Sequence, residues 1–365
     1  METAYINLND LRIGRIVAED IFANTKYPII HKNTLITPNH LNVLKAFHVL
    51  KVPIELDGNE KHQDFMNDDI EQEMEELEIR PSAATFEKRY NDAVEEFEKV
   101  FFSWESGAKI EITKIREIIL PLVDEILNDR AILFKLNNYS IPKNYLYHHC
   151  IATGLISASI ANKLGYERGF VLQIAIAGVL ADCGMAKVPQ SIREKQGTLT
   201  EHEFLLIRKH PLFSFKMIAN LPAMKDEMKL AIYQHHERLD GSGYVEGIKL
   251  GKISTFAQII AVADTFHAMT SERFYRSKES PFKVIEMFKG TEFGKFDIKV
   301  VEALVQLIAT LPIGTLIELS NLEHAKIMYI NSFSPTRPLV KLLNTGEIID
   351  LSKQRSLYIS KVIPD

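Results

Sequence analysis

The segment from Asn144 to Ile308 constrains the fold most, because nearly all of it repeats apolar residues at helical spacing. Examples are YLYHHCIATGLISASIANKLG, FVLQIAIAGVLADCG and STFAQIIAVADTFHAMTSE. Glycine or proline closes most of these runs, as is usual at helix ends. Residues at this spacing form the buried face of a helix, so the segment predicts an all-α core domain.

The flanking segments have other patterns. Residues 1–58 alternate short apolar runs with turn residues, which predicts a small α+β N-terminal domain. Residues 59–140 begin with an acidic stretch and continue with helical spacing, so we expect an acidic helical connector and further helices, one of them kinked or ended by Pro121. Residues 311–365 carry short β-type runs, which predict a small β C-terminal segment. The fold class is therefore mainly α, with the helical core at 141–310.

Composition and charge exclude several classes of protein. The net charge of -5 gives no basic field, so we expect no nucleic acid partner. Two cysteines, Cys150 and Cys183, exclude a disulfide framework and favour a cytoplasmic location. The first residues show no basic region followed by an apolar run, so we expect no secretory signal. The apolar stretch 170–183 is shorter than the roughly 20 residues of a membrane span, which predicts a buried helix instead.

Histidines gather in the helical core, where seven of the twelve in the chain fall between His148 and His267. Histidine is a common ligand of transition metals. Asp182 and Asp264 stand inside apolar runs, where burying an unpaired carboxylate is costly and a metal ion offsets that cost. A helix cap or a buried salt bridge is the alternative for either aspartate alone. Together these residues predict a metal site.

Spacing within the cluster separates the candidate ligands. His235 and His236 are adjacent, so on a regular helix their side chains diverge by about 100° and do not easily enter one coordination sphere. One of the two would then serve a second ion or the substrate. Asp264 and His267 are three residues apart and share a helical face, which makes His267 an additional candidate ligand.

Two further motifs are suited to a ligand rich in phosphate. The run HHERLDGSGYVEG contains Asp240, Gly243 and Tyr244, and its glycines allow backbone to approach a ligand, although a plain tight turn has the same composition. The run TSERFYRS places Arg273 and Arg276 three residues apart. Guanidinium groups at that spacing suit phosphate oxygens, and ordinary salt bridges are the alternative.

Five ordered blocks between residues 145 and 276 resemble an HD-GYP domain, a branch of the HD metal-dependent phosphohydrolases. The blocks are the helix around His149, GVLADCGMAKVP, KHP at 209–211, HHERLDGSGYVEG and IIAVADTFHAMTSERFYR. The resemblance implies an all-helical fold, two or three metal ions that are often iron or manganese, and hydrolysis of cyclic di-GMP.

The sequence departs from that family's pattern at several positions. Ala181 precedes Asp182 where the family has the histidine of its His-Asp pair, and Met185 replaces a lysine, with Lys187 on a different face. Tyr145 stands where members with three metals carry glutamate, which favours two ions here. The signature reads Gly-Tyr-Val instead of Gly-Tyr-Pro, and position 267 holds histidine where relatives have aspartate.

Carried over residue by residue, the resemblance implies a ligand set and a substrate set. The ligands would be His149, Asp182, His210, His235, His236 and Asp264, with His267 as the additional candidate. Asp182 would bridge two ions, iron or manganese, and a hydroxide between them would attack phosphorus, which makes Asp182 the catalytic residue. The substrate-binding residues would be Arg273, Arg276, Asp240, Gly243 and Tyr244.

Two functions follow from these residues. The first is a phosphodiesterase acting on cyclic di-GMP or a related cyclic dinucleotide, favoured by the six retained ligands. The alternative is a catalytically weakened relative that keeps the metals and acts as a nucleotide sensor or a signalling module for protein partners, favoured by the missing histidine and lysine. The helical connector is a candidate surface for pairing of two copies of the chain.

Overall fold

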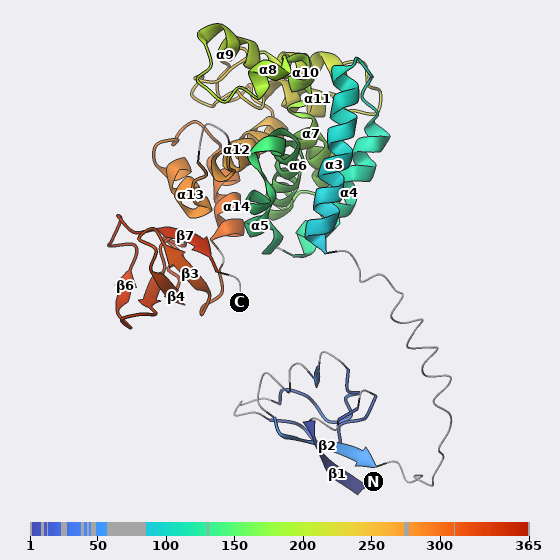
Figure 1. Ribbon diagram of the computed structural model, residues 1–365, viewed down its shortest axis with the longest axis vertical. Helices are drawn as coiled ribbons and strands as arrows, with labels where there is room; N and C mark the ends of the chain where they lie inside the picture. The colour runs from blue at the N-terminus through green and yellow to red at the C-terminus, as the bar shows by residue number, and fades with distance from the viewer. Residues whose placement is uncertain are drawn as a thin grey trace. The chain divides into compact units, whose positions relative to one another are not determined.

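The computed structural model divides the chain into two compact units, Met1–Pro81 and Ser82–Asp365 (Figure 1). The acidic stretch from Glu60 to Arg80, expected to be a connector, lies outside the described residues. The described residues are 2–8, 11–12, 14–22, 28–37, 40–41, 44, 49–56, 85–129, 131–273, 277–309 and 311–363.

The first unit is built around a two-stranded antiparallel sheet of β1 (Glu2–Asn7) and β2 (Lys51–Leu56). Single β-bridges extend this pairing, including one between Val17 and Ile54. Both of these residues are fully buried in a small apolar core of their own. The short apolar runs of the N-terminal segment therefore form a separate folded unit.

The second unit is mainly helical, as the apolar spacing predicts. Its helices begin with side-chain caps at several places; the hydroxyl of Thr85, for example, accepts a hydrogen bond from the backbone of Lys88. The helices are α3 (Phe86–Glu105), α4 (Ile112–Asn128), α5 (Ala131–Tyr139), η2 (Pro142–Asn144), α6 (Tyr145–Lys163), α7 (Arg168–Leu180), η3 (Cys183–Lys187), α8 (Gln190–Arg193), α9 (Glu201–Ile207), α10 (His210–Ile218), α11 (Asp226–Gln234), α12 (Thr255–Thr270), α13 (Pro281–Lys289) and α14 (Ile298–Ile308).

Helix α6 is the central helix of this unit (Figure 1). Every residue from Tyr147 to Ala161 is buried, because α3, α4, α5, α7, α12 and α14 all pack against it. A polar side chain on α6 is therefore held away from bulk water and needs a partner inside the domain.

Two details of the helices bear on the sequence predictions. We expected Pro121 to kink or to end a helix. Helix α4 continues through Pro121, so the expectation that the helix ends there is wrong. Among the described residues, one stretch, Arg168–Lys187, is apolar and long enough to cross a membrane, but 67% of its most apolar window is buried inside the domain. That burial is what a core helix shows.

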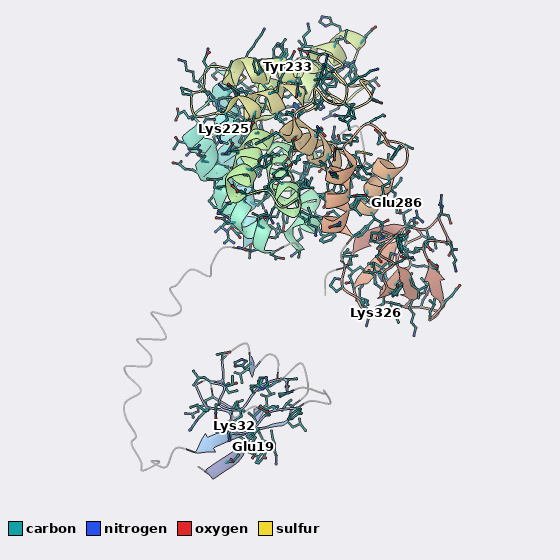
Figure 2. The ribbon with its side chains drawn as sticks, turned by 180° about the vertical axis from the view of Figure 1, so that it is seen from behind. Glu19, Lys32, Lys225, Tyr233, Glu286 and Lys326 are labelled. Atoms are coloured by element: carbon teal, nitrogen blue, oxygen red, sulfur yellow. The ribbon has the colours of Figure 1, made fainter. Side chains whose placement is uncertain are left out.

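The C-terminal residues form an antiparallel sheet with strand order β6-β5-β4-β3-β7. The side chains of Glu286 on α13 and Arg337 join helix to sheet, with Nε of Arg337 donating to Oε1 at 2.7 Å and Nη2 to Oε2 at 2.6 Å; Figure 2 labels Glu286. The fold class predicted from the sequence is confirmed. The strands are β3 (Leu316–Leu319), β4 (His324–Tyr329), β5 (Leu339–Leu342), β6 (Ile348–Asp350) and β7 (Ile359–Val362).

Candidate metal centre

The six side chains expected as ligands come together inside the helical unit. Their ligand atoms form two groups, and within each group all the atoms lie within 4.8 Å of one another. One group holds Asp182, His210, His235 and His236, and the other holds His149, Asp182 and Asp264. Asp182 is common to both.

Asp182 presents one carboxylate oxygen to each group. Its Oδ1 lies 3.0 Å from Nε2 of His210 and 3.4 Å from Nε2 of His235, whereas Oδ2 lies 3.5 Å from Nε2 of His149. The hydroxyl of Ser214 fixes the chain on both sides of this aspartate, because it donates to the carbonyl of Ala181 and accepts from the backbone of Gly184, each at 2.7 Å. A carboxylate in this position is suited to bridge two cations.

His210 and His235 are held in one orientation by backbone carbonyls. Nδ1 of His210 donates to the carbonyl of Ile207 at 2.8 Å, and Nδ1 of His235 donates to that of Ile232 at 2.7 Å. In the neutral rings both Nε2 atoms are then acceptors, yet they face each other at 3.2 Å and also face Asp182.

The donor set fits a bound metal ion. Oδ1 of Asp182 is buried and accepts no well-aligned hydrogen bond from the described residues, although His210 lies close to it. The three acceptors are Oδ1 of Asp182 and the Nε2 atoms of His210 and His235. A proton on one imidazole satisfies only one pair of them, whereas a divalent cation satisfies all three together. Nitrogen and carboxylate oxygen ligands of this kind suit iron, manganese or zinc.

The electrostatics keep three of the candidate ligands, Asp182, His236 and Asp264, in the forms that bind metals. Burial raises the pKa of Asp182, but the histidines around it, His210 first, hold that pKa well below its usual value. The pKa of Asp264 is likewise raised by burial and lowered more strongly, His236 contributing most. Burial, followed by the nearby His235, holds the pKa of His236 well below its ordinary value. At neutral pH the two carboxylates are ionised and His236 is uncharged.

His236 joins His235 in the same group, which differs from the divergence expected on a regular helix. Helix α11 ends at Gln234, so the two histidines do not continue the helix. Their rings lie 4.1 Å apart, and Nδ1 of His236 is 3.8 Å from Oδ2 of Asp264. The end of the helix is what brings adjacent side chains to one place.

His267 lies behind His149 and belongs to neither ligand group found among the described residues. Nε2 of His149 faces Asp264 at 2.8 Å, while its Nδ1 faces His267 at 3.0 Å and the hydroxyl of Tyr145 at 3.1 Å. The ring of His267 also contacts Ser271. His267 and Tyr145 are therefore placed to orient the His149 ring from its far side, and a ligand role for His267 stays a prediction.

Two of the positions that depart from the family pattern, 181 and 185, carry apolar side chains. Ala181 is 3% exposed, and Met185 packs against the hydrophobic core. Lys187 does not replace the missing cation, because its Nζ donates to the carbonyl of Trp104 at 2.7 Å, at the end of α3. Its charge is used to cap a helix.

Lys187→Met is expected to lower the free energy of unfolding by about 1 kcal/mol, because the charged hydrogen bond to the last turn of α3 is lost. Metal content should stay at the parental value. Urea unfolding with elemental analysis tests both, with the exposed Lys135→Met on α5 as the control. Parental stability combined with weaker nucleotide binding would instead assign this ammonium to the substrate.

The loop after His236 covers the imidazole of that residue with an aromatic ring. Tyr244 stacks on His236 with ring centroids 4.6 Å apart, and the guanidinium of Arg208 lies 4.4 Å over the same tyrosine. Only glycine fits at Gly243, since a Cβ there would lie 2.4 Å from the backbone nitrogen of Arg238 and 2.5 Å from the carbonyl oxygen of His236. The close approach of the loop to the backbone therefore positions Tyr244.

A buried carboxylate that the sequence analysis did not single out holds this loop. Glu237 is 3% exposed and accepts hydrogen bonds from the backbone of Glu246, Gly247 and Ile248. Its place directly after the two histidines was the available signal. Asp240 instead lies at the surface and accepts two hydrogen bonds from the serine two residues later, so it stabilises the loop's own turn.

The structure describes one of the two arginines expected to bind substrate, Arg273. Nη2 of Arg273 donates to the carbonyl of Ala268 at 2.7 Å, and its guanidinium lies 4.4 Å over the ring of Tyr145. Arg273 is thus one aromatic ring away from His149. Arg276 lies outside the described residues, and its role stays a prediction.

Comparison with known proteins identifies the helical unit. A family model described as HD domain matches residues 121–300. The chain is 30% identical over 224 residues to the cyclic di-GMP phosphodiesterase PdeB of Borreliella burgdorferi, covering 60% of this chain and 59% of that protein. It is 31% identical over 251 residues to a cyclic di-GMP phosphodiesterase of Thermotoga maritima, covering 67% and 65%. The matches thus span about three fifths of the length of these relatives.

A solved structure has a similar fold. Bd1817, a HDG"Y"P protein from Bdellovibrio bacteriovorus, superimposes with a TM-score of 0.50 at 15% sequence identity, over 84% of this chain and 99% of that one. At this identity the likeness concerns the fold alone.

Proposed function

Because the helical domain of this chain belongs to the HD family, in its HD-GYP branch, we propose that the protein is a metal-dependent phosphodiesterase of cyclic di-GMP or a related cyclic dinucleotide. One observation carries the proposal: two groups of nitrogen and oxygen ligands converge and share the carboxylate of Asp182. That arrangement suits two divalent ions, and we propose iron or manganese.

The residues of this chain would divide the work of the reaction. His210, His235 and His236 would hold one ion and His149 and Asp264 the other, and both groups would share the carboxylate of Asp182. When bound, the ions supply Lewis-acid activation of the phosphate and of the attacking water. No side-chain nucleophile is needed for this chemistry.

Charged and aromatic groups around the ligands would position the substrate. Arg273 and Arg276 would bind non-bridging phosphate oxygens, and Arg208 offers a further cation beside the ring of Tyr244. The loop that contains Gly243 and Tyr244 would border the nucleotide and limit access of water.

Purified protein is expected to carry about two transition-metal ions per chain and to hydrolyse cyclic di-GMP. Elemental analysis measures the first, and chromatography of the products before and after chelation measures the second. Chelation should abolish hydrolysis, and adding back iron or manganese should restore it. Protein without stoichiometric metal, even after anaerobic reconstitution, would contradict the proposal.

The alternative function is a metal-containing nucleotide sensor with little catalysis. Ala181 and Met185 favour it, because an imidazole and an ammonium of the family pattern are both replaced by apolar side chains. Tight binding of cyclic di-GMP without any product in the same experiment would select this alternative. A cytoplasmic location, pairing of two copies and signalling-protein partners stay predictions.

A further inference from the structure

A partly open cavity of about 60 Å³ lies next to the metal centre. Tyr145 separates the two, since it lines the cavity while its hydroxyl contacts His149 at 3.1 Å. The charged side chains of Lys143, Arg193, Glu194 and Arg273 also line the cavity.

Arg193, on α8, is the unusual group in this cavity. Its side chain is 5% exposed, one of its nitrogens pairs with Glu105 on α3, and its guanidinium lies 5.3 Å from the ring centroid of Phe101. Nε and Nη1 are buried and have no hydrogen-bond partner among the described residues. A buried cation with two unsatisfied nitrogens is costly, and an anionic acceptor would remove that cost.

The charges around the cavity also favour an anion. Lys143, Arg193 and Arg273 contribute three cations to its lining, against the single carboxylate of Glu194. That carboxylate accepts a hydrogen bond from the side chain of Gln190 at 3.0 Å. Glu105 pairs with only one nitrogen of Arg193.

We propose that Arg193 and Lys143 form a subsite for the second, non-scissile phosphate of a cyclic dinucleotide. The inference rests on the proposed function, because the first phosphate is then at the metal ligands. A cyclic dinucleotide carries both phosphates on one ring, so the second must lie within a nucleotide's length of the first. The cavity is one aromatic ring away from His149 and meets that requirement.

Arg193→Gln tests the subsite. We expect the dissociation constant of a hydrolysis-resistant phosphorothioate analogue of cyclic di-GMP, measured by calorimetry on the metal-loaded full chain, to rise about tenfold or more. KM for cyclic di-GMP should rise in parallel, with a smaller change in kcat. Unchanged affinity for the analogue would overturn the proposal.

Glu105→Gln separates phosphate binding from a purely structural ion pair. It breaks the same pair but leaves the guanidinium in place, so the analogue should bind as tightly as to the parent or more tightly. If Arg193 only tethers α8 to α3, both variants will lower the melting temperature alike and neither will weaken binding selectively. Arg168→Gln, which breaks an exposed pair with Asp124, is the matched control.

A second substrate keeps the two proposals distinguishable. Bis(p-nitrophenyl) phosphate has one phosphodiester and reports on the metal centre of the parent protein alone. Hydrolysis of this compound with equal analogue affinity in the parent and Arg193→Gln would reject the subsite and keep the phosphodiesterase. If the parent does not hydrolyse this compound but Arg193→Gln binds the analogue more weakly, the phosphodiesterase is rejected and the phosphate subsite is kept.

Discussion

Asp182→Ala is expected to empty both halves of the metal centre and to abolish hydrolysis, because this one carboxylate belongs to both ligand groups. Even outer partners of metal ligands typically cost about 10- to 100-fold when removed, so loss of a shared ligand should cost about 100-fold or more. Elemental analysis and initial rates measure the two effects. His236→Ala should lower the metal content less than Asp182→Ala, since it removes one candidate ligand from one group only.

Two controls guard the Asp182 experiment. Asp182→Asn keeps the size of the buried side chain and one neutral oxygen, so it separates metal loss from unfolding. Asp226→Ala removes an aspartate whose side chain is 99% exposed and should leave metal content and rate unchanged. Full metal content in a folded Asp182→Ala protein would show that another residue bridges the ions.

Gly184→Ala is expected to destabilise the protein by about 3 kcal/mol and to weaken metal binding. An added Cβ would lie 2.2 Å from the carbonyl oxygen of His210 and 2.3 Å from the backbone nitrogen of Ser214. Both are backbone atoms of α10, so the helix itself must move, and its first residue, His210, is a candidate ligand. Chemical unfolding and a competitive metal titration measure the two effects.

Gly169→Ala is the matched control for this substitution. Gly169 lies in the first turn of α7, and an added Cβ there meets no atom within 4 Å. Alanine should therefore stabilise the helix, by about 0.5 to 1 kcal/mol. If the two alanine variants have equal stability, the close packing of η3 against α10 is not what positions His210.

Apolar periodicity was enough to predict the helical unit and most of the C-terminal sheet. The shortest strand of that sheet is β6 (Ile348–Asp350), which apolar periodicity does not predict. It has three residues, too few for alternation to be recognised, and it forms because β5 offers an edge to pair with. Tertiary context decides such short strands.

The geometry of the site could not be predicted from the sequence where it depends on the residue at which a helix ends. The candidate ligands that the structure brings together were found from polar residues in apolar runs and from the family resemblance. The grouping of His235 with His236 was not found in this way, because it depends on α11 ending at Gln234. Arg193 gave no signal either, since an arginine in a polar stretch is ordinarily exposed and only the folded chain buries it against Phe101.

The imidazoles of His210 and His235 each donate a hydrogen bond to a backbone carbonyl, and these bonds make helix formation and site assembly a single event. Each imidazole satisfies a carbonyl in the last turn of a helix, Ile207 of α9 or Ile232 of α11, that would otherwise lack a helical partner. The rotamer freedom of both rings is therefore lost during folding and not when an ion arrives. An incoming ion meets ligands already in place, so its affinity is reduced little by conformational entropy, and uptake should need no rearrangement of these two side chains.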